Sequence, residues 1–433
     1  MAKNKNNQAI WSTRIKKNAS SLFQKVGNSI DIDRRLYKED IQGSIAHVEM
    51  LFKQKIISFK IKNKIIYGLT KIDKEIAKNK FEFNKKYEDI HMNIEKRLFQ
   101  IIGEEAGYVH TARSRNDQVL VSIQLYLIDE LNNIKTEVKS LFDLLIKLAN
   151  KNKDIIMPGY THMKAAMPSS FGLWFSAYAE TLIDDIISLN SSIEIVNQNT
   201  LGSAAGYGTS FNIDRDFTTK DLNFKTLKYN SLACQISRNK IEKNTFDAIG
   251  NIAFTLSKIS MDICLYSGDE FQFISFPENI TTGSSIMPHK KNPDVFEIIR
   301  GKCNSIQNLS NSVNLSSTNL PSGYHRDFQL NKGKIINAVN DIKECIQILS
   351  YCLSMISVNK KILQKSNYEN IFSVELINEM VLKGMPFRDA YLELKSKLKS
   401  GEIKFPKTVN HSHIGSIGNL ALDKIVLKMK DYY

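Results

Sequence analysis

A polar stretch from Thr281 to Arg300 contains the residue types in this chain that are best suited to chemistry. Its first half combines a glycine, two serines, a histidine and two lysines without an apolar period, which is typical of a mobile loop. Its second half predicts a helix start, with Asn292 as N-cap, Pro293 at the first helical position, and Asp294 and Glu297 in the first turns. Such a loop is suited to closing over an anionic substrate, and an ordinary polar connection is the alternative.

A second polar segment, His110–Gln118, carries two arginines and three small polar side chains within six residues. A guanidinium offers paired N–H donors that fit the two oxygens of a carboxylate, so this segment is suited to gripping carboxylates. The charged start of a helix is the alternative interpretation of the same pattern.

These two segments resemble known sequences. Gly283–Pro293 resembles the signature loop of the fumarase/aspartase superfamily, and His110–Gln118 closely matches the sequence that marks argininosuccinate lyases within it. The resemblance extends from Ser29 to Tyr391 and is weakest between Phe52 and Lys86. It implies the reversible β-elimination of argininosuccinate to arginine and fumarate in arginine biosynthesis, without a metal or an organic cofactor.

The resemblance also assigns catalytic roles, and elimination explains why these residue types are needed. A base must remove a proton from the carbon next to a carboxylate, and an acid must protonate the departing guanidino nitrogen. Ser284 matches the family's base, with Ser285 as the structural alternative, and Lys290 is expected to stabilise the negative charge. His162 matches the proton donor, and Glu297 matches the residue that pairs with this histidine.

The family's substrate contacts fall on ten further positions. Those expected to hold the succinyl half are Ser114, Arg115, Asn116 and Thr161. Those expected to hold the arginine half are Ser29, Asp89, Asn292, Tyr324, Gln329 and Lys332. A carboxylate, amides and hydroxyls suit a guanidinium and an amino-acid head group.

One segment departs from the family pattern. Where many members have Ser-Asp-Arg-Asp, this chain has Ile236-Ser237-Arg238-Asn239, which keeps the arginine and loses both acids. The loss puts in doubt any role of those acids in ordering the neighbouring loop.

The sequence also allows other functions. The nearest is another superfamily lyase that releases fumarate, such as an adenylosuccinate lyase or an aspartase, and a catalytically silent structural relative is the second. The net charge of +14 allows nucleic-acid binding, but the basic residues are spread along the chain and form no recognised nucleic-acid module. We therefore expect no nucleic-acid partner.

The apolar pattern predicts an all-α protein. Steps of three and four residues from Leu120 to Leu148 indicate one long helix, and comparable patterns recur at 173–196, 246–265, 295–313 and 335–356. Five long helices imply a bundle, and their seams favour burial against other subunits. Before them, helix patterns at 40–51 and 88–102 flank a lysine-rich region that we expect to be a solvated helix pair.

Combined with the resemblance, these patterns predict a three-domain fumarase/aspartase-like fold that assembles into a homotetramer with shared active sites. The expected domains are an N-terminal helical domain (1–110), a central five-helix bundle (111–361) and a small C-terminal helical domain (362–433). We expect no metal site, because no cluster has ligand spacing.

Composition favours a cytoplasmic protein. The hydrophobic content of 42% can fill a large core, and the five cysteines are odd in number and lie in apolar helical patterns, as buried reduced thiols do. The N-terminal segment is polar, and no apolar run that follows it is expected to span a bilayer, so we expect no membrane association.

Overall fold

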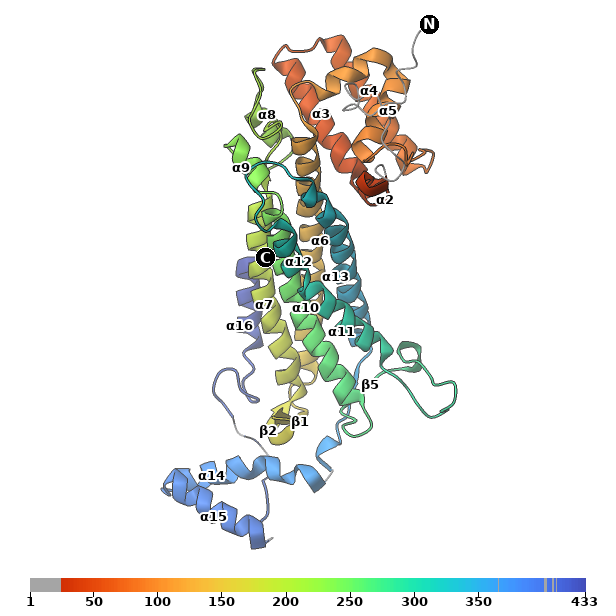
Figure 1. Ribbon diagram of the computed structural model, residues 1–433. Coiled ribbons are helices and arrows are strands. Elements are labelled where there is room, and N and C mark those ends of the chain that lie inside the picture. The colour runs from red at the N-terminus through yellow and green to blue at the C-terminus, as the bar shows by residue number, and fades with distance from the viewer. Residues whose placement is uncertain (1–24, 365, 401–402, 407–408, 410) are drawn as a thin grey trace. The chain divides into compact units, whose positions relative to one another are not determined.

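The computed structural model describes residues 25–364, 366–400, 403–406, 409 and 411–433 (Figure 1). The chain forms two compact units, each drawn from three segments. Unit 1 comprises Met1–Asn132, Ser191–Asp247 and Leu309–Val339, and unit 2 comprises Asn133–Asn190, Ala248–Asn308 and Asn340–Tyr433. Both units contain parts of the central segment, and the three-domain division of the sequence stays a prediction.

Unit 1 begins with short helices around an apolar core. They are α2 (Ile30–Asp33), η3 (Arg34–Leu36), α3 (Tyr37–Lys53), α4 (Phe59–Ala77), α5 (Ile90–Ile102) and η4 (Gly103–His110). The predicted helices at 40–51 and 88–102 are confirmed as α3 and α5. Gly68 lets α4 approach α5 closely, because an added Cβ would lie 2.3 Å from a methyl of Leu98.

The expectation of a solvated helix pair between these helices is wrong. The lysine-rich region forms one helix, α4, followed by an irregular segment from Lys78 to Glu88. One face of α4 is buried in the core of unit 1 through Ile65, Leu69 and Ile72, and its lysines lie on the other faces. The high lysine content concealed this apolar stripe, which repeats at helical spacing.

The long helices confirm four of the five predicted patterns. They are α6 (Arg115–Lys151), α7 (Phe171–Val196), α10 (Lys240–Ser267) and α13 (Leu330–Ser354). The fifth pattern is wrong as a single helix, because α11 (Asp294–Gln307) ends at Asn308 and α12 (Leu309–Ser317) follows. At the break the Asn308 N–H bonds to Ser305 O in a tight turn, and the Gln307 side chain bonds to Cys303 O.

Within unit 2 these helices form a bundle, and polar contacts link their faces. Trp174 Nε1 and the Tyr178 hydroxyl of α7 both donate to Asp262 of α10, at 3.0 and 2.6 Å. Lys302 of α11 reaches the Asp341 carboxylate of α13 at 2.9 Å. The predicted all-α class is confirmed.

The strands are short and come in pairs. They are β1 (Ile156–Thr161) with β2 (Lys164–Ser170), β3 (Gln198–Asn199) with β4 (Thr226–Leu227), and β5 (Ile274–Ser275) with β6 (Ser357–Val358). The first pair is an antiparallel hairpin in unit 2, and the second is parallel in unit 1. In unit 1, α8 (Arg215–Asp221) and α9 (Ser231–Ile236) flank β4.

The C-terminal part of unit 2 contains η7 (Ile362–Gln364), η8 (Ser366–Phe372), α14 (Ser373–Leu382), α15 (Phe387–Ser400) and α16 (Leu422–Tyr432). Helices α14 and α15 pack on a small core that includes Ile377 and Leu394. Helix α16 lies alongside α7, and Lys428 pairs with Glu180 at 3.1 Å (Figure 1).

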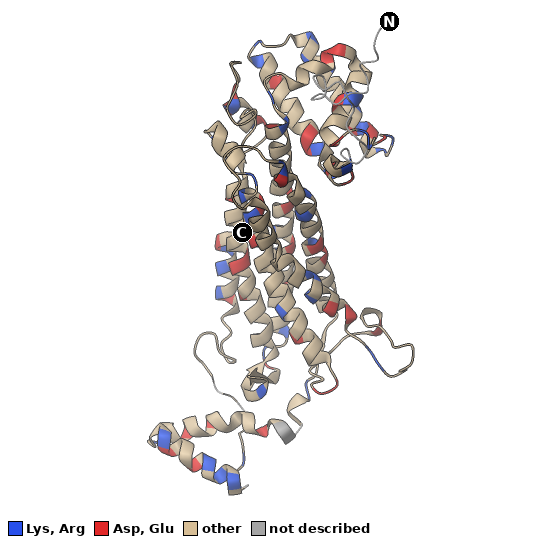
Figure 2. Cartoon of the chain, in the orientation of Figure 1, with Lys and Arg blue, Asp and Glu red and all other residues tan. Residues whose placement is uncertain are grey.

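The distribution of charges and the free cysteines agree with the expectations from the sequence, whereas the apolar character of one helix does not. Figure 2 shows Lys and Arg interspersed with Asp and Glu along most helices, as expected for a dispersed basic excess. All five cysteines are free, and four of them are buried. The expectation that no apolar run could span a bilayer is wrong for α10, the one described helix that is long and apolar enough, although 56% of that stretch is buried in the structure.

Candidate active site

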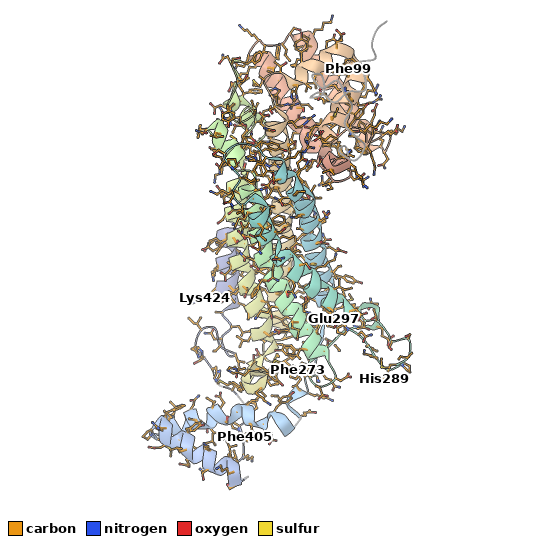
Figure 3. The ribbon with its side chains drawn as sticks, in the orientation of Figure 1. Phe99, Phe273, His289, Glu297, Phe405 and Lys424 are labelled. Carbon is orange, nitrogen blue, oxygen red and sulfur yellow. The ribbon has the colours of Figure 1, made fainter. Side chains whose placement is uncertain are left out.

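The signature segment in unit 2 is a closed loop tied at its base. The Thr282 N–H donates to Asn292 O at 3.2 Å, and the Asn292 N–H donates to Thr282 O at 2.8 Å. These two hydrogen bonds hold together the two ends of the loop formed by residues 283–291. Figure 3 shows this loop, with His289 near its tip, projecting away from the helices, whereas Glu297 lies on α11. This geometry suits a lid that moves as a body about its base.

The predicted N-cap role of Asn292 is wrong. Helix α11 begins at Asp294, and Pro293 occupies the N-cap position without a side-chain hydrogen bond. The backbone of Asn292 is held in the bridge to Thr282, and its side-chain amide points back to Gly283 O at 3.5 Å. The side chain is therefore not engaged at the helix end.

Ser284 is half-buried and differs from its neighbour Ser285 in one respect. Its Oγ accepts the N–H groups of Ile286 and Met287, at 3.4 and 3.2 Å. Within the described chain Ser285 has no such donors and is exposed. Because aligned N–H groups stabilise negative charge on an oxygen, this geometry favours Ser284 over Ser285 as the residue that becomes an alkoxide.

The lysines of the loop are not equivalent. Lys291 pairs with Glu278 at 3.0 Å, whereas Lys290 is exposed and has no ion pair in the described part of the chain. The expected contact of Lys290 with Ser284 is not formed in this structure. Lys290 is therefore available to an anionic ligand.

His162 lies at the tip of the β1–β2 hairpin. Thr161 pairs with Lys164, so His162 and Met163 form a two-residue turn, with φ of 50° and 60°. Positive φ at two residues that are neither Gly nor Asn is unfavourable, and such strain is concentrated at functional sites. Both Thr161 and His162 are exposed. Within the described residues of this single chain, His162 contacts neither Glu297 nor Ser284.

Unit 1 contains a buried ion pair beside one predicted substrate contact. Lys332 Nζ lies 2.7 Å from one oxygen of Asp33 and 2.8 Å from the other, and both side chains are at most 2% exposed. Ser29 Oγ donates to the same carboxylate and lies 3.4 Å from Lys332 Nζ. Helix α2 and the start of α13 are thereby joined through Ser29 and Lys332.

Asp89 and Arg115 form a second pair in unit 1. Asp89 caps α5 by accepting the Met92 N–H at 2.7 Å, and its other oxygen lies 3.2 Å from Arg115 Nε. Burial would raise the pKa of Asp89, but Arg115 and the other nearby donors hold it below its usual value. Asp89 therefore stays ionised, as a contact for a cationic group must.

Ser114 is positioned by Asp117, which is fully buried at the start of α6, and the Asn116 N–H donates to Ser114 Oγ at 3.3 Å. One Asp117 oxygen accepts the Ser114 N–H at 2.9 Å, and the other accepts the N–H groups of Gly202 and Ala204. Burial raises the pKa of Asp117 to about 6, against the lowering effect of these donors and of Arg113. The carboxylate joins the arginine-rich turn to a glycine-rich loop.

Asp40 also helps to hold this arginine-rich turn in place. It accepts Gln118 Nε2 at 2.7 Å and lies 2.7 Å from His91 Nδ1, and both its partners are buried. Arg115 in turn donates to Gln118 Oε1 at 2.7 Å, so the guanidinium is held from two sides.

The remaining predicted contacts lie on the segment before α13. The Tyr324 ring packs edge-on against Phe328, which immediately precedes Gln329 in the chain. Burial raises the pKa of the Tyr324 hydroxyl, so it stays protonated and able to donate.

The predicted site residues therefore fall into two sets. Unit 1 holds Ser29, Asp89, Ser114, Arg115, Asn116, Tyr324, Gln329 and Lys332, and unit 2 holds Thr161, His162, Ser284, Lys290, Asn292 and Glu297. Sequence reasoning missed Asp33, Asp40 and Asp117. The spacing Ser114-x-x-Asp117 was a usable signal, because it resembles a capping box at a helix start.

Comparison with solved structures places this fold among known lyases. An EDDS lyase variant with bound fumarate superposes with a TM-score of 0.81 at 20% identity, covering 96% of this chain and 91% of that one. A class II fumarase from Schistosoma mansoni superposes with a TM-score of 0.71 at 17% identity, covering 96% and 93%. A family model described as a lyase matches residues 13–308. The fold and the family model together define a lyase of the fumarase/aspartase type.

Comparison with curated proteins narrows this class. The argininosuccinate lyase of Phocaeicola vulgatus is 43% identical over 98% of this chain and 95% of its own length. That of Pelagibacter ubique is 46% identical over 96% of this chain and 90% of its own length. The chain belongs to the argininosuccinate lyase family, as the two sequence segments predict.

Proposed function

We propose that this chain is an argininosuccinate lyase, which converts L-argininosuccinate reversibly to L-arginine and fumarate. The observation that carries this proposal is the identity of 43% to 46% with argininosuccinate lyases over nearly the whole chain. The physiological role that follows from the activity is arginine biosynthesis. Five free cysteines, none in a disulfide, support a reducing cytoplasm as the location.

The unit 1 residues hold the substrate. Arg115, Ser114 and Asn116 grip the carboxylates of the succinyl half, and Thr161 of unit 2 adds a hydroxyl. The ionised Asp89 suits the cationic arginine half, together with Ser29, Tyr324, Gln329 and Lys332, and Asn292 adds an amide from the base of the loop.

The unit 2 residues move the protons. Ser284, as an alkoxide held by two backbone N–H groups, takes a proton from the carbon next to a succinyl carboxylate. The charge that grows on that carboxylate is held by Lys290. The C–N bond then breaks, and protonated His162 gives its proton to the departing guanidino nitrogen. Glu297 keeps the imidazole charged and oriented.

The active site assembles between subunits of a homotetramer. Within the described residues of one chain, His162 contacts neither Ser284 nor Glu297. A second copy therefore supplies the Ser284 and Glu297 that act with this histidine. Exposed apolar side chains on α10, Phe254 at 56% and Met261 at 46%, support burial against other copies.

Mixing inactive Ser284→Ala and Arg115→Gln chains by joint refolding should restore activity, because hybrids contain sites that lack both substitutions. Mixtures with no more activity than either variant would contradict shared sites.

The activity is tested by incubating purified protein with argininosuccinate and following fumarate by its ultraviolet absorbance. We expect arginine and fumarate in equal amounts. Release of AMP from adenylosuccinate or of ammonia from aspartate, without turnover of argininosuccinate, would identify another superfamily lyase. Lack of turnover with all three substrates would indicate a silent relative.

A further inference from the structure

A pocket in unit 1 lies outside the residues assigned above. Its volume is about 310 Å³, at the low end of the range typical of small-molecule sites. The walls come from the start of α10, the end of α12 and the segment that leads to η6 (Arg326–Gln329). The polar and charged residues of the lining include Arg238, Asn239, Lys240, Lys243 and Ser317.

Arg238 is the unusual member of this lining. It is 2% exposed, and its Nε donates to Glu242 at 3.3 Å. Both terminal nitrogens are buried and have no hydrogen-bond partner in the described part of the chain. A guanidinium carries five N–H donors, and leaving the charged fork unpaired in the interior is costly. The fork is therefore suited to an acceptor that enters from the pocket.

The neighbouring side chains do not supply that acceptor. Asn239 is fully engaged, because its amide nitrogen donates to Ser317 Oγ and its oxygen accepts from Asn331 at 3.0 Å. Within the described chain, Glu242 is the one carboxylate in contact with Arg238.

Two lysines add positive charge to the lining. Lys240 is exposed and has no ion-pair partner among the described residues. Lys243 is paired with Asp247 at 2.5 Å, and both side chains are partly exposed. In the described chain, the pocket thus has a buried guanidinium that is paired with Glu242 but whose terminal N–H groups lack acceptors, together with the unpaired Lys240 and with Lys243, which is paired with Asp247. Unfilled donors and the excess positive charge of Lys240 favour an anion.

We propose that this pocket binds a small oxyanion, a phosphate or a carboxylate, on the terminal nitrogens of Arg238, with Lys240 and Lys243 completing its neutralisation. Paired N–H donors match two oxygens of either group, which gives the fork its preference for these ligands. The pocket is distinct from the residues that we assign to the substrate, so the proposal does not depend on the proposed function.

The test is anion binding by the intact chain, measured by calorimetry with inorganic phosphate and, separately, with succinate. Thermal unfolding in phosphate and in chloride of equal ionic strength gives a second readout, because a ligand of the native state raises Tm. We expect wild-type protein to bind at least one of the two anions, and the arm that binds identifies the ligand as phosphate or carboxylate.

Variants decide where the anion binds. Arg238→Gln should abolish binding at this pocket, leaving only any succinate that the proposed substrate site holds and that Arg115→Gln removes, and the double variant Lys240→Gln/Lys243→Gln should raise the pocket's Kd at least about fivefold. The double variant changes partly exposed lysines, so it keeps the test decisive if Arg238→Gln fails to fold. Arg115→Gln is the matched control and should retain the pocket's binding. Binding of neither anion, binding that the pocket variants leave unchanged, or binding lost in Arg115→Gln alone would overturn the proposal.

Discussion

The residues of unit 1 that we propose hold the substrate and the residues of unit 2 that we propose move protons are built in opposite ways. In unit 1, Lys332, Asp33 and Asp89 are buried and fixed by ion pairs and hydrogen bonds. In unit 2, His162 and Lys290 are exposed on a hairpin tip and a loop, without ion pairs in the described chain. The two sets therefore differ in how far they are organised before substrate binds.

This difference suits a division of labour. Preorganised binding groups hold a flexible substrate at small entropic cost. A loop that carries the base can admit substrate when open and exclude water when closed. Because of this difference, a substitution in the buried set should lower both stability and activity, whereas a substitution in the exposed set should lower activity and leave stability nearly unchanged.

The largest expected effect is the loss of turnover in Ser284→Ala. A positioned base contributes about 10²- to 10⁴-fold, so we expect kcat to fall about 10³-fold with the fold intact. The matched control is Ser285→Ala, which should keep kcat within about tenfold because Ser285 lacks the two N–H donors. Steady-state fumarate release measures both. A larger loss in Ser285→Ala would reverse the assignment.

Lys332→Met and Lys290→Met test the stability side of the comparison. Both should reduce activity, but Lys332→Met leaves Asp33 as an uncompensated buried charge and should lower the free energy of unfolding by about 3 kcal/mol. Lys290 is exposed and unpaired, so its substitution should change that free energy by less than about 0.5 kcal/mol. Urea unfolding gives both values, and equal losses would abolish the distinction between the two regions.

Two buried carboxyls, one in each unit, should respond to pH with opposite sign. Burial would raise the pKa of Asp40 in unit 1, but His91, Arg113 and Gln118 lower it to about 2. Its stabilising contribution is present above its ordinary pKa of 3.8 and is lost as pH falls towards 2. Burial raises the pKa of Asp185 in unit 2 to about 7, so the folded state retains a proton and stability falls as pH rises from 3.8 to about 7.

Denaturant unfolding at pH 8 and at pH 4 checks these signs. At pH 8, relative to wild type, Asp40→Asn should lose on the order of 2 kcal/mol and Asp185→Asn should gain on the order of 4 kcal/mol, at about 1.4 kcal/mol for each unit by which the pKa is shifted. At pH 4 the gain in Asp185→Asn should fall below about 1 kcal/mol, because the folded-state carboxyl is then neutral and the unfolded-state carboxyl, with a pKa of 3.8, is only partly ionised. Changes of the same sign in the two variants at pH 8 would contradict this account.

The smallest expected effect concerns the base of the loop. The Thr282 hydroxyl donates to the Asp294 carboxylate beside the backbone bridge. Thr282→Val removes this hydrogen bond and keeps the bridge, so we expect kcat to change by less than about fivefold and stability by about 1 kcal/mol. A loss as large as that of Ser284→Ala would show that the loop depends on this hydroxyl.

Much of the fold could be predicted from apolar spacing. The patterns of α6, α7, α10 and α13 are long enough for the helical period to be unambiguous. The break at Asn308 was hidden because the apolar period continues through it. The single buried face of α4 was hidden because lysines dominate its composition, although a stripe such as Ile65, Leu69 and Ile72 suffices for burial.

The sequence segments that carry the candidate site could be recognised, whereas the residues that support them could not. Ser284 and Arg115 lie in segments distinctive enough to be recognised. Asp33 and Asp40 act through partners distant in sequence, Lys332 and His91, which no local spacing reveals. Asp117 has a local signal in its spacing from Ser114, but its contact with Gly202 has none. The unpaired fork of Arg238 likewise depends on what surrounds it in space.

The central claim is that unit 1 binds the substrate and Ser284 acts only afterwards. The most direct test is calorimetric binding of intact argininosuccinate to Ser284→Ala protein. Our account predicts binding within about fivefold of the wild-type KM and no conversion during the titration. Failure of the folded variant to bind the substrate, or conversion at a rate near wild type, would contradict it.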